Sequence, residues 1–308
     1  MGMTAHAWID GRIESADAPL LRVTDRGFQL GDGIFETMRA RRGVPIELDE
    51  HLERLRESAV PLGIQLPEED GPLIGAIAAI LRAEGLAGDG SGNHAPGDAA
   101  LRITVSRGAI PGRGLSPTAA AAGKPASPTI VVQAWPYAPP SATVVERGLS
   151  VVTSSVRRDP GSPLAGVKTT SRAESVYARL EAERAGADDA IVLTTHGEVG
   201  EATSANLFIV RGRRLVTPPL DAGCLAGTTR GWLLAHAAIY DFVAEEASLR
   251  PSDLVKADEI LLSSSVAGVL AVTRLDGLPV GRGTAGPTTL LLRRMREEWI
   301  DRVSLARS

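Results

Sequence analysis

The sequence predicts an α/β protein built from two units, and three observations lead to this expectation. The chain has 308 residues, which is long for one domain when domains average ~150 residues. Stretches that alternate apolar and polar residues, as strands do, are interspersed with stretches of helical spacing along the whole chain. The stretch PYAPPSA at 136–142 has the composition of a linker. We therefore expect a first domain at 1–135, a linker at 136–145 and a second domain at 146–308.

The first unit is expected to combine short strands with two helices. Residues 49–63 carry apolar residues at helical spacing, with Asp49 as the N-cap, and a second helix is expected at 70–86. Composition predicts loops at 87–98 and 108–128, and a loop as long as the second is uncommon unless it has a function. Strands are expected at 5–13, 20–24, 34–41, 99–107 and 129–135.

The second unit repeats this mixture of strands and helices. Two apolar runs, AIVLT at 190–194 and NLFIV at 206–210, flank a turn at His196-Gly197 and are expected to pair as a hairpin. The stretch at 259–272 is rich in strand-forming residues. A further strand is expected near 149–155, and helices are expected at 169–186, 228–241 and 287–303.

Composition excludes several classes of function. The formal net charge is −4 with a pI near 5.8, which gives no general attraction to nucleic acid or to an anionic membrane. No apolar run approaches the ~18 residues of a membrane-spanning helix, and the amino-terminal residues do not have the form of a signal peptide. The single cysteine excludes an internal disulfide, and the five scattered histidines form no HExxH motif. We expect a cytoplasmic protein without a metal site.

One lysine stands out against this background. Of 33 basic residues only Lys124, Lys168 and Lys256 are lysines. Lys256 lies between Asp253 and Asp258, as a surface lysine would, and Lys124 lies in the long loop. Lys168 lies among small uncharged residues in AGVKTTS. Arginine cannot replace a lysine that must lose its proton and attack a carbonyl, because a guanidinium stays protonated. Lys168 is therefore a candidate for Schiff-base formation, and the alternative is an ordinary surface lysine.

Other stretches offer the parts that a pyridoxal-type cofactor would need. Glu198 and Glu201 precede an apolar strand, and either carboxylate could pair with a ring nitrogen or merely solvate a turn. Arg54, on the predicted helix 49–63, could bind phosphate or lie exposed. Two further groups of residues could bind an anion or serve as ordinary caps. Gly227, Thr228 and Thr229 lie at the start of the helix near 228, and Ser264 and Ser265 lie at the end of an apolar strand.

From Asp25 to about Thr273 the sequence resembles the class IV, fold-type IV pyridoxal-phosphate enzymes. This family includes branched-chain and D-amino acid aminotransferases, R-selective amine transaminases and aminodeoxychorismate lyases. The segments that carry the resemblance are DRGFQLGDGIFETMR, HLERLRESA, AGVKTTSRAES, GADDAIVLTTHGEVGEATSANLFIV, LVTPPLDAGCLAGTTR and ADEILLSSSVAGV. Their order and spacing are specific for the family and less specific for one member.

The resemblance implies a fold, a cofactor and roles for residues. It implies a smaller amino-terminal α/β domain, a larger carboxy-terminal pseudo-barrel domain, pyridoxal 5′-phosphate (PLP) between them, and a homodimer. Lys168 matches the Schiff-base lysine, which also moves a proton. Glu201 matches the carboxylate at the ring nitrogen, and Arg54 matches a phosphate-binding arginine. Two turns match the family's phosphate-binding turns, with Thr228 in place of the usual Ile: Gly227, Thr228 and Thr229, and then Ser264 and Ser265.

The member of the family is left open by the sequence. Branched-chain enzymes often have a Tyr five residues after the lysine, where this chain has Ala173. The expected substrate loop is 106–117, with Arg113 as a candidate clamp for a carboxylate and Phe35 across from it. The stretch SRGAIPGRG also resembles aminodeoxychorismate lyases, but KTTSR lacks an Asn that lyases often carry. We expect a transaminase acting on an amino acid or amine and a 2-oxo acid, with a lyase as the alternative. A third possibility is an inactive small-molecule binding protein.

Overall fold

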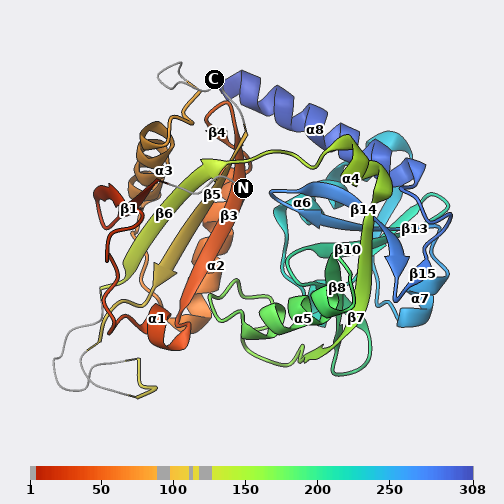
Figure 1. Ribbon diagram of the computed structural model, residues 1–308, viewed down its shortest axis with the longest axis horizontal. Helices are drawn as coiled ribbons and strands as arrows, with labels where there is room; N and C mark the ends of the chain where they lie inside the picture. Colours follow the sequence, from red (N-terminus) through yellow and green to blue (C-terminus); the bar gives the residue numbers. More distant parts are fainter. Residues whose placement is uncertain (1–4, 89–97, 111–113, 118–126, 308) are drawn as a thin grey trace. The chain divides into compact units, whose positions relative to one another are not determined.

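The computed structural model describes residues 5–88, 98–110, 114–117 and 127–307, and it confirms the mixed α/β class (Figure 1). The chain forms two compact units. Unit 1 consists of the residues up to Ala138, a short segment at Val167–Arg172, and the chain from Ile300 onward. Unit 2 consists of Pro139–Gly166 and Ala173–Trp299. The segment that contains Lys168 therefore belongs to unit 1, although the chain on both sides of it belongs to unit 2.

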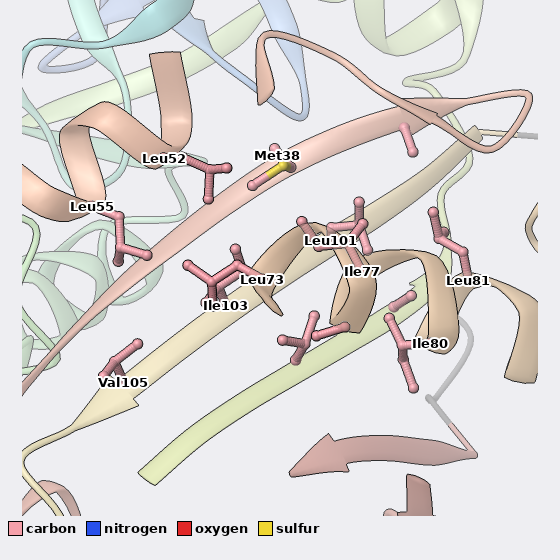
Figure 2. Close-up of a cluster of buried hydrophobic side chains, with 14 of the residues drawn as sticks. Met38, Leu52, Leu55, Leu73, Ile77, Ile80, Leu81, Leu101, Ile103 and Val105 are labelled. Atoms are coloured by element: carbon pink, nitrogen blue, oxygen red, sulfur yellow. The ribbon is translucent and has the colours of Figure 1, made fainter. Parts of the chain in front are cut away.

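Unit 1 is built on a six-stranded antiparallel sheet with the order β2-β1-β6-β5-β3-β4. Helices α2 and α3 pack their apolar residues against one face of this sheet, and Figure 2 shows the resulting core around Met38, Leu101 and Ile103. The elements are β1 (His6–Ile9), β2 (Arg12–Ser15), α1 (Arg26–Leu30), β3 (Gly33–Arg41), β4 (Val44–Pro45), α2 (Leu48–Leu62), α3 (Gly71–Ala83), β5 (Asp98–Ser106) and β6 (Thr129–Pro136).

The two faces of β3 have different roles because side chains alternate along a strand. Ile34 and Met38 point into the core between the sheet and the helices, together with Leu101 and Ile103 of the neighbouring strand β5. Phe35 lies opposite Thr104, so its ring stands on the other face. The same register places Arg102 opposite Thr37 on the face of Phe35.

Unit 2 contains a nine-stranded mixed sheet with the order β12-β11-β10-β13-β14-β7-β8-β9, to which β15 adds beside β14. Apolar clusters lie on both faces, one of them under α6 and α8. The strands are β7 (Leu149–Arg158), β8 (Asp189–Thr194), β9 (Val199–Ala202), β10 (Asn206–Arg211), β11 (Arg214–Thr217), β12 (Val243–Glu246), β13 (Glu259–Ser264), β14 (Gly268–Leu275) and β15 (Leu278–Pro279). The helices are α4 (Ala142–Arg147), α5 (Ala173–Arg184), α6 (Thr228–His236), α7 (Pro251–Val255) and α8 (Pro287–Arg307), with 3-10 turns at Leu220–Ala222 and Ala237–Tyr240. The part of α8 from Ile300 onward belongs to unit 1.

The predicted hairpin between 190–194 and 206–210 is wrong. β8 pairs with β7 and with the short strand β9, whereas β10 pairs with β11 and β13. The strand β9 was missed because its sequence, VGEA, contains Gly200 and has no β-branched run. Gly200 is needed there, since a Cβ at this position would lie 2.8 Å from the Val192 carbonyl oxygen.

Three other predictions about helices and strands differ from the structure. Residues 20–24 form no strand, and Val23 is exposed. The helix predicted from 169 begins only at Ala173, because residues 167–172 run along unit 1 instead. The helix predicted at 49–63 is α2, which begins at Leu48 after Glu47 in the left-handed conformation. Asp49 therefore lies in the first turn of α2 rather than at its N-cap. Among the described residues, no helix is long and apolar enough to cross a membrane.

Candidate active site

Lys168 is fixed to unit 1 through its backbone. The Phe35 amide donates to the Lys168 carbonyl oxygen (3.0 Å), and the Thr170 amide donates to the Gly33 carbonyl oxygen (2.9 Å), so the lysine segment adds to the start of β3 as a short extra strand. The Lys168 amide donates to the hydroxyl of Ser58 on α2 (3.3 Å). A Cβ at Gly33 would lie 2.7 Å from the Val105 carbonyl oxygen, which explains the glycine in GDGIFE.

The side chain of Lys168 lies over an aromatic ring. Its Nζ is 4.7 Å from the centroid of the Phe35 ring. The guanidinium carbons of Arg102 and Arg172 lie 4.0 Å and 5.8 Å from the same centroid. The structure therefore brings the predicted residues Lys168 and Phe35 together, and it adds two arginines that the sequence analysis missed. Only the register of β5 against β3 places Arg102 there.

Arg54 lies on the other face of β3, in a buried cluster of charged groups. Its Nε donates to Glu36 Oε1 (2.8 Å) and its Nη2 donates to Oε2 (2.7 Å), while His51 Nδ1 lies 2.7 Å from Oε2. Burial alone raises the pKa of Glu36, but the hydrogen bonds from Arg54 and His51 outweigh burial and lower this pKa to about 2. Burial lowers the pKa of His51. An ionised Glu36 thus fixes the plane of the Arg54 guanidinium.

In unit 2, Glu201 is held by three donors. Its Oε2 accepts from Asn206 Nδ2 (3.0 Å) and from the Leu225 amide (3.0 Å), and its Oε1 accepts from Nη1 of Arg158 at the end of β7. Glu198, the other carboxylate considered from the sequence, instead accepts from Ser248 and lies beside Arg250. Glu201 is therefore the carboxylate with a fixed, largely buried position, and Arg158 and Asn206 are partners that the sequence analysis did not identify.

The predicted anion-binding turns come together in unit 2. Gly227 precedes α6, and the hydroxyls of Thr228 and Ser265 lie 3.2 Å apart. A Cβ at Gly227 would clash with Asn206 Oδ1, so a side chain here would displace the amide that binds Glu201. Thr229 is 1% exposed, and its buried Oγ1 has no hydrogen-bond partner among the described residues. Such a hydroxyl, beside the backbone amides of a helix start, is what an anion would satisfy.

Two other predicted site residues, Ser264 and Arg113, have still to be placed. Ser264 accepts a hydrogen bond from the Ala267 amide (3.3 Å), which stabilises the turn between β13 and β14. Arg113 lies outside the described residues. Among the described residues, no cluster of three or more His, Cys, Asp or Glu side chains could hold a metal ion.

A lysine fixed by its backbone in unit 1, and a clamped carboxylate and a hydroxyl-lined helix start in unit 2, are groups that a PLP-dependent enzyme needs. The comparisons agree. The family of class IV aminotransferases matches residues 33–275. The chain belongs to this family, and its cofactor is PLP.

Relatives within the family have different reactions. The chain is 32% identical over 295 residues to a protein of Methanocaldococcus jannaschii provisionally named a branched-chain-amino-acid aminotransferase, covering 96% of this chain and 95% of that protein. It is 28% identical to the aminodeoxychorismate lyase of Vibrio harveyi, covering 90% of this chain and 96% of that one. A branched-chain amino acid aminotransferase from the organism abbreviated T.th., solved with pyridoxamine 5′-phosphate, superimposes with a TM-score of 0.85 at 26% identity, over 97% of this chain and 94% of the other.

The residues present fit the cofactor. The orphaned Thr229 hydroxyl and the amides that open α6 suit the phosphate. Glu201, held by Asn206 and Arg158, suits a protonated ring nitrogen. Lys168 supplies an amine in a setting of uncharged neighbours in sequence.

Proposed function

We propose that the protein is an aminotransferase that moves an amino group between an amino acid or primary amine and a 2-oxo acid, with Lys168 as the residue that binds PLP through a Schiff base. The observation that carries the proposal is the position of Lys168, whose backbone is bonded to β3 and α2 and whose amine lies over Phe35. A surface lysine would not need such anchoring. When bound, PLP withdraws electrons from the carbon that carries the amino group.

The chain's own residues then have defined tasks. Lys168 would bind PLP and would move the proton at the substrate carbon that carries the amino group. Glu201 would keep the ring nitrogen protonated. Arg54 and Ser265 act with Gly227, Thr228, Thr229 and Ser264 as phosphate ligands. The support is the buried hydroxyl of Thr229 and the fixed guanidinium of Arg54.

A carboxylate of the substrate would be bound by arginine. Arg102 lies against Phe35 and, within the described residues, has no carboxylate partner; its Nε donates only to Thr104 Oγ1 (3.1 Å). A guanidinium in this state favours an incoming carboxylate. Arg113, on the predicted substrate loop, is the second candidate for this task. We propose Phe35 as the apolar wall of the same subsite.

Two assays on the purified protein test the proposal. One is reduction with borohydride, and the other is amino transfer with a panel of amino donors and 2-oxo acid acceptors. We expect borohydride to fix PLP on the peptide that contains Lys168, and we expect amino transfer with at least one donor–acceptor pair. Lys256→Ala is the matched control, because Lys256 is an exposed lysine outside the sequence motif around Lys168. A colourless protein without an adduct on Lys168 would refute the proposal, and it would favour the inactive binding protein considered above.

A second candidate is an aminodeoxychorismate lyase. The similarity to the Vibrio harveyi enzyme favours it, as does Ala173 in place of the Tyr often found in branched-chain enzymes. It predicts release of pyruvate and 4-aminobenzoate from aminodeoxychorismate without any 2-oxo acid. Pyruvate release under these conditions, with no transfer from any donor in the panel, would decide for the lyase.

We also propose that the protein is a homodimer. Val23, Phe28 and Leu115 are 75%, 71% and 81% exposed in unit 1, and a second chain that covered them would remove apolar surface from water. Light scattering coupled to size exclusion is the test. A mass of about 32.2 kDa, that of one chain, would refute the dimer.

A further inference from the structure

Arg26, at the start of α1, binds the backbone of a distant loop segment in unit 1. Its Nη1 donates to the carbonyl oxygens of Gly114 (3.1 Å) and Ser116 (3.2 Å), and its Nη2 donates to that of Leu115 (3.1 Å). These three residues, which we call the carbonyl segment, belong to no helix or strand. Arg26 is 8% exposed, so one largely buried guanidinium satisfies three successive backbone acceptors.

The shape of the carbonyl segment depends on this cation. Three carbonyl oxygens that converge on one point repel one another, because each carries a partial negative charge. Gly114 has a φ of +128°, a backbone angle that glycine tolerates and residues with a side chain rarely adopt. Without the guanidinium of Arg26, the three oxygens would have to turn toward water, and the segment would leave this conformation.

Asp32 fixes the guanidinium of Arg26. Arg26 Nε donates to Asp32 Oδ2 (2.7 Å), and Arg107 donates to both oxygens of the same carboxylate, at 2.7 and 2.9 Å. Arg107 also donates to the carbonyl oxygens of Leu62 (2.6 Å) and Gly63 (3.3 Å) at the end of α2. Burial alone raises the pKa of Asp32, but the hydrogen bonds from the two arginines outweigh burial and lower it. An ionised Asp32 thus joins an arginine that holds α2 to an arginine that holds the carbonyl segment.

The turn that contains Asp32 also carries the lysine. The hydroxyl of Thr170 donates to the Gly31 carbonyl oxygen (2.8 Å), and the amide of Thr170 donates to the Gly33 carbonyl oxygen (2.9 Å). Thr170 follows Lys168 by two residues. The backbone of this one turn therefore binds the lysine segment, while its side chain anchors the arginine that holds the carbonyl segment. All of these residues belong to unit 1.

We propose that Arg26 is a positioning residue, which fixes the carbonyl segment relative to Lys168 and thereby limits which amino donors fit beside the lysine. The inference rests on the proposed function, because it concerns the donors that reach Lys168. Arg26 acts through the backbone carbonyls it binds. The lysine backbone has separate contacts with Phe35 and Ser58. Loss of Arg26 should therefore weaken donor binding and leave proton transfer by Lys168 nearly unchanged.

Cleavage of the folded, full-length chain by chymotrypsin tests whether Arg26 holds the segment. The side chain of Leu115 is 81% exposed, but its carbonyl must leave Arg26 before a protease can cut the following bond, and the cleavage rate tracks the population of that open form. Arg26→Met keeps a similar stem and removes the guanidinium, so cleavage after Leu115 should become about tenfold faster, as loss of hydrogen bonds from a charged donor implies. Tyr177, on α5 of unit 2, is 49% exposed, and cleavage after it reports unfolding of the whole chain and should not change.

Steady-state kinetics test the consequence for the donor. In Arg26→Met we expect the KM of the amino donor to rise about tenfold while kcat stays within about twofold, the pattern of a lost binding interaction. A variant that was merely less stable would contain less active enzyme. Its apparent kcat would fall and its KM would stay the same, so the ratio of the two effects separates positioning from stability.

Arg56→Met is the matched control in unit 1. Arg56 also joins a carboxylate to a loop, because it donates to Asp70 Oδ1 (3.0 Å) and to the Pro67 carbonyl oxygen (2.8 Å). Its removal should change neither the cleavage of the carbonyl segment nor KM. Arg26→Lys keeps the charge without the planar fork and should lie between the unmodified chain and Arg26→Met. Asp32→Asn should raise the cleavage rate and KM by smaller amounts, and it serves as the test if Arg26→Met does not fold.

Two outcomes would overturn the inference. One is cleavage after Leu115 at the same rate in Arg26→Met as in the unmodified chain; the other is faster cleavage with an unchanged KM for every donor. Failure of the proposed function looks different, because borohydride would then fix no PLP on Lys168 of the unmodified chain. The cleavage measurement needs no cofactor and decides in that case whether Arg26 holds the segment.

Discussion

Two buried carboxylates, Glu36 in unit 1 and Glu201 in unit 2, are held in different ways. Unit 1 packs whole ionic side chains together, as in the cluster of Glu36, Arg54 and His51, where every member is almost fully buried. Unit 2 surrounds its key carboxylate, Glu201, with a backbone amide and the side-chain amide of Asn206 besides one arginine. Glu36 is thus balanced by ionisable side chains alone, whereas Glu201 is held by one arginine and two amide donors. The first arrangement should be sensitive to loss of a charge, and the second to loss of shape.

The largest expected effect falls on unit 1. Lys168→Ala removes the amine that we propose to bind PLP and move the proton, and loss of proton transfer alone should lower kcat roughly 10²–10⁴-fold. Lys168→Arg should fail equally, since a guanidinium keeps its proton. Steady-state rates with the best donor–acceptor pair provide the measurement. Turnover of the Arg variant near that of the unmodified enzyme would contradict the role of the amine.

Glu36→Gln tests the charge-by-charge arrangement through stability. The change leaves Arg54 buried beside a neutral amide, and breaking a buried ion pair typically costs about 3–5 kcal/mol of folding free energy. Urea unfolding of the cofactor-free chain gives the value. Glu298→Gln, in an exposed pair with Arg294 on α8, is the control and should cost under about 1 kcal/mol. A Glu36→Gln variant as stable as this control would show that the buried cluster contributes nothing net.

The cluster of Glu36, Arg54 and His51 should make the stability of the folded chain depend on pH. The pKa of Glu36 falls from 4.5 to about 2 on folding, so its stabilising effect is complete above pH ~4.5 and is lost as the pH falls toward 2. The shift corresponds to about 3 kcal/mol. Acid unfolding of the unmodified chain should therefore be steep between these pH values. In Glu36→Gln the free energy of unfolding should no longer fall steeply between these pH values. If it falls as steeply as before, other groups cause the loss of stability in acid.

These contrasts explain what the sequence could predict. The motif around Lys168 and the carboxylate of EATSANLF are local in sequence, so the sequence alone names Lys168 and Glu201 as candidates. Their partners are not local. Arg158 reaches Glu201 from 43 residues away, and Arg102 faces Phe35 only through the β3–β5 register. The wrong hairpin has the same origin, because apolar runs at 190–194 and 206–210 identify strands but not which strand each one pairs with.

In unit 2, Glu201→Gln tests the carboxylate that Arg158 and two amide donors hold in place. The variant keeps the shape but removes the charge that would hold a proton on the cofactor ring, and we expect kcat to fall roughly 10²-fold, as when one preorganised electrostatic partner is lost. The control is Glu198→Gln, three residues earlier, whose carboxylate accepts from Ser248 instead. Equal rates for both variants would refute the assignment of Glu201.

The smallest effect is expected at Thr229. Thr229→Val keeps the side-chain shape and removes a buried hydroxyl that has no hydrogen-bond partner in the described part of the chain, so the cofactor-free chain should be as stable as before or slightly more so. If the hydroxyl binds the PLP phosphate, the affinity for PLP should fall about tenfold, as loss of one hydrogen bond to a charged group implies. The affinity for pyridoxal, which lacks the phosphate, should not change. Fluorescence titration of the cofactor-free protein with both ligands measures the difference. A parallel loss for both ligands would mean that Thr229 shapes the site without contacting the phosphate, and unit 2 would then rely on backbone amides alone.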